Sequence, residues 1–248
     1  MKTNIKLISI LTWASLIFST PAKAFDSDFN SPSWEKSGDV SVVNPNQVNL
    51  STDGLFYDDF DLGADNGDFN FSGNPAAMVG FGGLEDFLDI DASVLDVGGY
   101  AYEGSAIKQT INVKTGDVLT FEWNFGTNET SLAADPWRGS FIDYTFFSIN
   151  GQLTKVADIN SANTDSPSIF DKETGTQIYQ HTFNNTGTYT VAFGLVDIDD
   201  YNVTSALSIK NINLERIQSV PEPVSQPITI LGTSILLGFS ALYKKKIR

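Results

Sequence analysis

Hydrophobic and polar residues alternate along much of the middle of the chain. Within residues 117–125, four large apolar residues fall on one side of an extended strand: Leu119, Phe121, Trp123 and Phe125. Such alternation predicts a strand of an antiparallel sheet with one buried and one solvated face. Residues 105–113 show the same period, and the turn residues 114–117 between the two segments predict a hairpin.

Further segments repeat this pattern. Asn150-Gly151, between residues 143–149 and 152–158, is a strong signal for a second hairpin because both positions tolerate positive φ. Residues 177–183 and 188–196 form a third pair of strands around the turn 184–187. A final strand covers residues 205–217, where a phase change in the apolar positions predicts a bulge.

Only residues 84–95 show the apolar spacing of a helix, which predicts one or two short helices over residues 84–90 and 93–95. Residues 66–83 predict a loop with one short strand near Met78 to Phe81. Many short strands between turn signals predict an all-β domain over residues 25–219, an antiparallel β-sandwich of jelly-roll-like type.

The N-terminus carries a targeting pattern. Residues 1–24 contain a short basic region, an apolar run from Leu7 to Phe18, and a small-x-small site at Ala22-Lys23-Ala24. These are the parts of a secretory signal peptide, and the apolar run is too short to span a bilayer. We therefore expect signal peptidase and the export machinery to process the chain, which leaves a mature N-terminus at Phe25.

The C-terminal region, residues 220–248, has three parts of its own. Pro221-Glu222-Pro223 precedes an uncharged, mostly apolar stretch from Ile228 to Tyr243, and a basic tail follows over residues 244–248. As a helix the stretch would be about 24 Å long, slightly short of a hydrocarbon core of roughly 30 Å, and local thinning of the bilayer closes that gap. By the positive-inside rule the basic tail stays in the cytoplasm, and the body of the protein lies on the other side of the inner membrane.

These three parts, in this order at the end of the chain, resemble the PEP-CTERM sorting signal of exopolysaccharide-producing bacteria. The resemblance implies that an exosortase-type membrane protease recognises the signal at Pro221, Glu222 and Pro223. It also implies that the transmembrane helix and tail are then removed, and that the protein is delivered to the cell envelope or the extracellular matrix.

Composition excludes several classes of function. The chain has no cysteine and a single histidine, so cysteine catalysis, disulfides, zinc–thiolate sites and multi-histidine metal sites are absent. Residues 25–220 carry eight basic and 29 acidic residues, a net charge of -21, which excludes binding to nucleic acid phosphates. So large a negative charge makes the body repel itself, and bound divalent cations would offset that repulsion. An acidic composition that merely suits a secreted protein explains the charge equally well.

The body also has a family resemblance. Its opening residues 25–29, 33–35 and 38–42 resemble galactose-binding-like jelly rolls of carbohydrate modules, in which an acidic strand precedes a tryptophan that caps the core. Residues 103–110, residues 117–129, and residues 193–200 leading to 205–207 resemble a domain that recurs in cyanobacterial PEP-CTERM proteins. The first resemblance implies a structural calcium that ties the N-terminal segment to the sheets, and the second implies no particular activity.

Two groups of aspartates are candidate calcium ligands, since calcium binds six to eight hard oxygens. They lie at the start of the body and in the loop after a core strand: Asp26, Asp28, Asp197, Asp199 and Asp200. The match to the modules is incomplete, because Lys210-Asn211 stands where many of them have an acidic pair. No cluster has the spacing of an EF-hand, and solvated loop acids are the alternative.

Sugar binding is the second candidate chemistry. Trp34 and Trp123 are expected in the core, whereas Trp137, in a loop-like stretch, is the expected exposed stacking platform. His181 shares one side of a strand with Tyr179 and Phe183, so its expected role is structural.

The hypothesis from the sequence is an exported, non-catalytic protein of the envelope or matrix that binds polysaccharide, with calcium holding its loops. One alternative is a purely structural surface protein. The other is a glycosidase with two catalytic carboxylates, although no spacing in the sequence selects such a pair.

Overall fold

The computed structural model describes residues 24–55, 69–129, 141–199, 201 and 203–216, and all of these belong to one compact unit that ends at Ile217. Several predicted features lie outside the described residues: the signal peptide up to residue 23, Trp137, Asp200, and the C-terminal region with its apolar stretch. In the part that the structure describes, no helix combines the length and apolarity needed to cross a bilayer.

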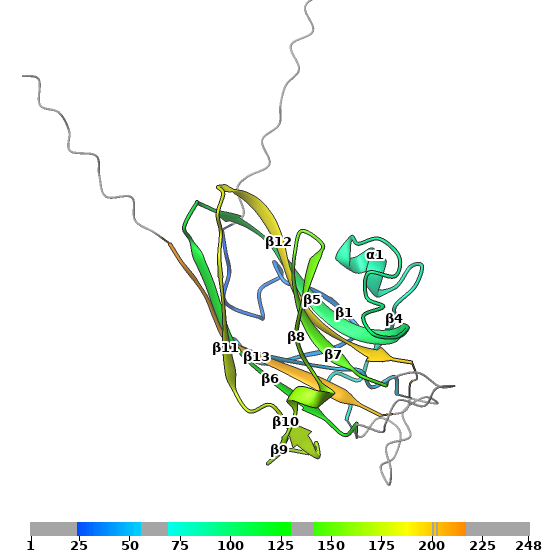
Figure 1. Ribbon diagram of the computed structural model, residues 1–248. Helices are drawn as coiled ribbons and strands as arrows, with labels where there is room; N and C mark the ends of the chain where they lie inside the picture. The colour runs from blue at the N-terminus through cyan, green and yellow to red at the C-terminus, as the bar shows by residue number, and fades with distance from the viewer. Residues whose placement is uncertain (1–23, 56–68, 130–140, 200, 202, 217–248) are drawn as a thin grey trace, which may run out of the picture. The chain divides into compact units, whose positions relative to one another are not determined.

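Two antiparallel sheets face each other, which confirms the predicted β-sandwich (Figure 1). Sheet A has the order β1-β5-β12-β7-β8, with β4 also paired to β5. Its strands are β1 (Glu35–Ser37), β4 (Ala77–Met78), β5 (Ala101–Val113), β7 (Tyr144–Ile149), β8 (Gln152–Asp158) and β12 (Gly187–Ile198).

Sheet B has the order β2-β3-β13-β6-β10-β9, with β11 also paired to β6. Its strands are β2 (Asp39–Asn44), β3 (Gln47–Ser51), β6 (Val118–Thr127), β9 (Thr164–Asp165), β10 (Lys172–Glu173), β11 (Gln177–Thr182) and β13 (Ser205–Glu215). The last strand of the chain, β13, therefore lies inside the sheet, between β3 and β6.

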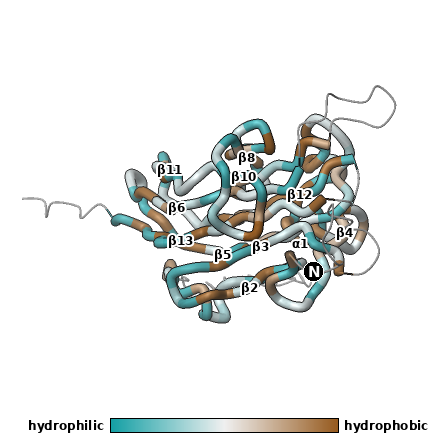
Figure 2. Tube along the Cα trace, turned by 90° about the horizontal axis from the view of Figure 1, so that it is seen from below, coloured by the Kyte–Doolittle hydropathy of each residue, from teal (hydrophilic) through white to brown (hydrophobic). Residues whose placement is uncertain are grey.

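The core between the sheets is largely aromatic. Phe121 of sheet B meets Phe147 and Phe193 of sheet A, with ring centroids 4.7–5.5 Å apart in this trio. Trp34 and Trp123 are both buried, as predicted, and the Trp34 indole donates a hydrogen bond to the Asp26 carbonyl oxygen at 3.0 Å. Hydropathy alternates along the strands as the sequence pattern requires (Figure 2).

A second, smaller core lies on the outer face of sheet A. Helix α1 (Leu84–Leu88) buries Leu84 and Leu88 there, and Tyr144 of β7 donates a hydrogen bond to the Leu95 carbonyl oxygen at 2.7 Å. Burial of Tyr144 raises the pKa of its phenol. The predicted helix at 84–90 is confirmed, whereas residues 93–95 form turns; a 3-10 turn, Ile159–Ser161, follows β8.

The predicted hairpin between residues 105–113 and 117–125 is wrong, because β5 lies in sheet A and β6 in sheet B. The turn between them crosses from one sheet to the other, and the Lys114 N–H donates to the buried Asp117 carboxylate at 2.9 Å. Each strand buries its apolar face against the opposite sheet. Residues 177–183 and 188–196 are divided between the sheets in the same way.

Other predictions of local structure are correct. Asn150 and Gly151 both have positive φ and join β7 to β8 in a hairpin. The predicted bulge in the last strand appears as a register shift between Lys210 and Asn213, with Asn211 at a φ of 51°. The short strand expected near Met78 is β4.

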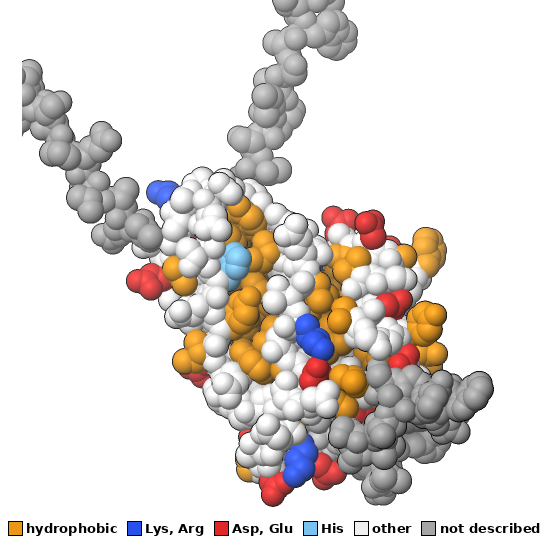
Figure 3. Space-filling view, in the orientation of Figure 1, with side chains coloured by type: hydrophobic (Ala, Val, Ile, Leu, Met, Phe, Trp, Pro, Cys, Tyr) orange, Lys and Arg blue, Asp and Glu red, His pale blue; other side chains and the backbone are white. Residues whose placement is uncertain are grey.

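An aromatic groove opens between β8 of sheet A and β11 of sheet B; Figure 3 shows its hydrophobic lining and His181. Its aromatic residues are Phe147, Tyr179, His181, Phe183 and Tyr189, around a cavity of about 240 Å³. His181 packs edge-on against Phe183 at 4.9 Å, which confirms its place beside Tyr179 and Phe183 on one side of the strand. Burial lowers the pKa of His181 below 6.5.

Candidate functional site

A cleft of about 220 Å³ lies on the outer face of sheet B. Its floor contains a row of polar side chains on three adjacent strands, because Ser208 of β13 lies opposite Asn49 of β3 on one side and Asn124 of β6 on the other. Neighbouring strands are about 4.8 Å apart, so the row spans about 10 Å. The inward residues of the same strands belong to the core, and the outward ones line the cleft, where the Gln47 side-chain amide donates to Asn49 at 3.1 Å and to Ser208 at 3.3 Å.

Phe71 and Phe170, from two separate segments, line one side of the cleft beside this floor, and we call them the aromatic wall. Phe71 comes from the loop before β4, and Phe170 comes from the turn between β9 and β10; their ring centroids are 6.4 Å apart. Phe69 packs on Phe170 at 5.3 Å. Phe170 lies over Gly126 of β6, where a Cβ atom would be 3.3 Å from its ring, so the small residue makes room for the wall.

Two fully buried aspartates hold the loop that carries Phe69 and Phe71. The Asp39 carboxylate accepts hydrogen bonds from the Phe71 N–H at 2.9 Å and the Ser72 N–H at 2.7 Å. The Asp53 carboxylate accepts from the Phe69 N–H at 3.1 Å. Hydrogen bonds to charged acceptors are the stronger kind, so these carboxylates fix the position of the aromatic wall.

The cleft has little charge for so acidic a chain. Glu173 is the only carboxylate among the described residues that line it, and it accepts hydrogen bonds from Asn124 at 3.1 Å and Ser166 at 2.9 Å. Lys210 contributes a cation to the lining. The described lining therefore offers amides, hydroxyls and one carboxylate, whereas glycosidases normally use two carboxylates.

Four of the five predicted calcium ligands are described by the structure, and these four do not come together as one group. Asp26 lies beside Gln109, which accepts from its N–H at 3.0 Å, and Gln109 pairs with Val191 of β12. Asp197 is six residues further along β12, about 20 Å from Val191, so it lies at a different place along the strand from the contact of Asp26 with Gln109. Asp26 and Asp28 instead accept hydrogen bonds from nearby N–H groups in the N-terminal turn.

Asp197 has an acidic neighbour that the sequence did not indicate. It lies directly opposite Glu103 in the ladder between β12 and β5, and the two side chains are only 1% and 2% exposed. A Cβ atom on Gly54 would be 3.2 Å from both Glu103 carboxylate oxygens. Their carboxylate oxygens are hard ligands of the kind that calcium prefers.

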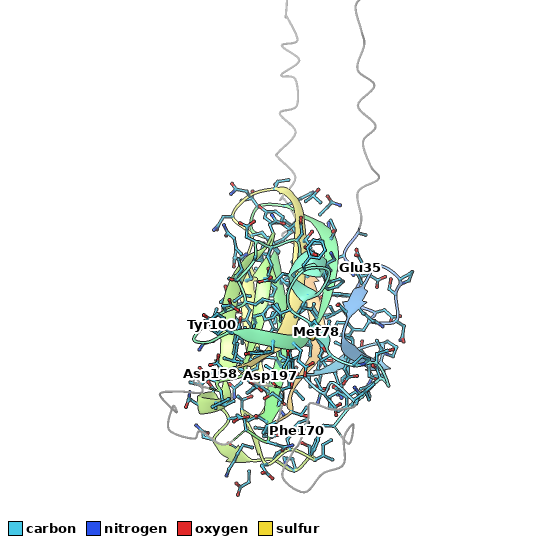
Figure 4. All side chains as sticks on the ribbon, turned by 90° about the vertical axis from the view of Figure 1, so that its right-hand side faces the viewer. Glu35, Met78, Tyr100, Asp158, Phe170 and Asp197 are labelled. Carbon is cyan, nitrogen blue, oxygen red and sulfur yellow. The ribbon has the colours of Figure 1, made fainter. Side chains whose placement is uncertain are left out.

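This pair fits calcium only in part. Within the described residues, no three His, Asp or Glu side chains are grouped to hold a metal ion. Asp199 instead serves a turn, since its carboxylate accepts the Tyr100 N–H at 2.8 Å. Figure 4 shows Asp197 and Phe170 in the same half of the sandwich, away from Glu35.

The sequence pattern did not single out the cleft residues. Asn124 falls on the solvated face of the strand predicted over residues 117–125, and Lys210 was noted only as a departure from a family pattern. The sequence signal for the cleft was the polar residues at outward positions of three strands. The sequence could not show that these three strands are neighbours, because that depends on the strand order of the sheet.

Comparisons with known proteins add little. No protein-family model matches the chain, and no curated protein is significantly similar to it. A solved structure described as "CBM4 structure and function" is 15% identical, with a TM-score of 0.25, and the match covers 56% of this chain and 92% of that one.

Two enzyme structures also match. A beta-glucosidase from Kluyveromyces marxianus is 9% identical over 72% of this chain and 17% of the enzyme, with a TM-score of 0.26. A cycloisomaltooligosaccharide glucanotransferase from Paenibacillus sp. is 12% identical over 76% and 19%, also at 0.26. The chain spans less than a fifth of either enzyme, and TM-scores this far below 0.5 carry no argument about its ligand.

Proposed function

We propose that the cleft on sheet B binds a segment of polysaccharide without cleaving it. The observation that carries the proposal is the polar row of Asn49, Ser208 and Asn124 beside the aromatic wall of Phe71 and Phe170. Amides and hydroxyls both donate and accept hydrogen bonds, which suits sugar hydroxyls, and an aromatic ring suits the apolar C–H face of a sugar ring.

Binding to a panel of soluble polysaccharides, measured by affinity electrophoresis and then by calorimetry on the best ligand, tests this function. Phe71→Ala should weaken binding about tenfold or more, as expected for an anchoring aromatic. Phe81→Ala is the matched control, because Phe81 is fully exposed and is not among the residues that line the cleft. Equal affinities of the two variants, or no binding by the native protein, would leave a purely structural surface protein; hydrolysis of the bound glycan would revive the glycosidase.

We further propose the export route that the two ends of the sequence indicate. Cleavage after Ala24 and processing near Pro221-Glu222-Pro223 by an exosortase-type protease would leave the binding domain in the envelope or matrix. Mass spectrometry of the native protein gives both mature termini. A C-terminus still ending at Arg248 would contradict this sorting.

Calcium is proposed as a structural ion at the buried pair formed by Asp197 and Glu103, with Asp26 and Asp28 outside the site. The pair supports the proposal because hard oxygens are the ligands that calcium prefers. Carbonyl oxygens and water would complete the coordination. The ion would hold the end of the sandwich where β5 and β12 meet the segment of Gly54.

A further inference from the structure

In the part of the chain that the structure describes, strand β11 leaves one edge of sheet B open. Within the described residues it pairs only with β6, on one side, and its other side borders the mouth of the aromatic groove (Figure 3). Its sequence from Gln177 to Thr182 contains no charge and no proline, and its pairing with β6 has no register shift. A regular, uncharged edge of this kind is a template for another strand.

The other edge strands that the structure describes are protected. Strand β1 has three residues and carries Glu35 and Lys36, and β4 and β9 have two residues each. The pairing of β2 with β3 and of β8 with β7 contains register shifts, and β8 carries Lys155 in an ion pair with Asp158. Among the described edge strands, only β11 is long, uncharged and free of a register shift. It is uncharged although residues 25–220 have a net charge of -21.

The backbone of β11 presents its free groups at alternate residues. Phe183, just after the strand, exchanges hydrogen bonds with residues 116 and 117, before the start of β6. In an antiparallel ladder every second residue bonds to the same neighbour, so Gln177, Tyr179 and His181 bond to β6. The N–H and C=O groups of Ile178, Gln180 and Thr182 therefore point away from β6.

We propose that β11 pairs antiparallel with β11 of a second copy of this chain, about a two-fold axis at Gln180. Ile178 of one copy then lies opposite Thr182 of the other, and the two Gln180 residues lie opposite each other. All three of these pairs are the hydrogen-bonding kind, since only outward-pointing residues are brought together. A two-fold pairing closes on itself and stops at a dimer.

The side chains of β11 complement themselves in this register. On the outer face, the exposed Ile178 meets Thr182, and Gln180 meets Gln180. On the groove side, Tyr179 of one copy lies opposite His181 of the other, at the close spacing of a non-hydrogen-bonded pair. No charged residue faces another across the pairing, so this edge is where two copies of an acidic protein can approach.

Single cysteines test the register directly, because the chain contains no cysteine of its own. In the proposed dimer the Cα atoms of the two Gln180 residues are about 5.5 Å apart, within the range of a disulfide. The two Gln177 residues, equally exposed on the same strand, are about 20 Å apart. Under mild oxidation, full-length Gln180→Cys in mild detergent should convert to a linked dimer while Gln177→Cys stays monomeric.

A second variant distinguishes pairing of β11 with β11 of another copy from crosslinking by random collision. Gln180→Pro removes only an outward N–H, so its melting midpoint should stay close to that of the native chain. Its dimer dissociation constant in sedimentation should rise about thirtyfold, the factor expected for two lost hydrogen bonds. Equal crosslinking of the two cysteine variants, or a native chain that stays monomeric over the whole concentration series, would overturn the proposal.

Discussion

The carboxylate of Asp39 links the stability of the sandwich to the shape of the cleft. It is fully buried and accepts hydrogen bonds from the Ser51 hydroxyl, the Phe71 N–H and the Ser72 N–H. The substitution Asp39→Asn keeps the size of the side chain but turns one acceptor oxygen into a donor. That donor then faces at least one N–H or O–H that has lost its acceptor.

The cost follows from these contacts. One lost hydrogen bond to a charged acceptor is worth about 1.5–3 kcal/mol, and a donor facing a buried donor adds about 1 kcal/mol. We therefore expect the free energy of unfolding to fall by about 2–4 kcal/mol. For a domain of this size the melting midpoint falls by about 4–16 °C. Glycan affinity should also fall under conditions where the variant is fully folded, because Phe71 is no longer held against the cleft.

Urea denaturation measures the first effect as a shift of the midpoint at constant slope. Asp28→Asn is the control: Asp28 also accepts a backbone N–H, from Asn30 at 2.8 Å, but it is exposed, so a change within about 0.5 kcal/mol is expected. If Asp39→Asn is no more destabilising than Asp28→Asn, the buried carboxylate does not hold the loop and the reasoning fails.

Three further outcomes are expected. Gly194→Ala should lower the free energy of unfolding by about 1–3 kcal/mol, since the new Cβ would overlap Phe146 and lie 2.8 Å from the Ser105 carbonyl oxygen; urea midpoints check it, and a shift under about 0.5 kcal/mol contradicts it. Burial lowers the pKa of His181, so the stability from its neutral form is complete above pH of about 6.5 and is lost as the pH falls toward the lower folded pKa. His181→Gln should flatten that part of a stability–pH profile, and identical profiles would exclude this cause. Calcium at about 100 times its Kd should raise the melting midpoint by about 5–10 °C, an effect that a chelator or Asp197→Asn removes; an unchanged midpoint in native protein removes the ion.

The sequence indicated which residues are buried better than it indicated which strands are neighbours. The alternation around Phe121 correctly predicted a strand with one buried face. It did not show that residues 105–113 belong to the opposite sheet. The alternating pattern is the same whether two successive strands are neighbours in one sheet or lie in two sheets that face each other across the core. The Asn150-Gly151 hairpin was predictable because its geometry is set locally by positive φ.

The candidate site was harder to predict because it depends on strand order and on buried acids. The predicted stacking platform, Trp137, lies outside the described residues, whereas the described cleft has a wall of phenylalanines. Nothing in the sequence distinguishes Asp39 and Asp53 from other polar residues. Only the fold shows that their carboxylates accept hydrogen bonds from the loop of Phe69 and Phe71. Asp197 was selected as a loop acid, but its partner Glu103 is distant in sequence and became visible only through the pairing of β12 with β5.

The position of β13 sets the order of events when the protein folds. This strand, the last of the sandwich, is inserted between β3 and β6, so sheet B has a gap at its centre until residue 215 is available. A nascent chain thus cannot assemble the whole sheet from the residues already synthesised. Folding is deferred until nearly the whole body has emerged, and a truncation before Ser205 would leave two incomplete fragments of a sheet instead of a smaller stable domain.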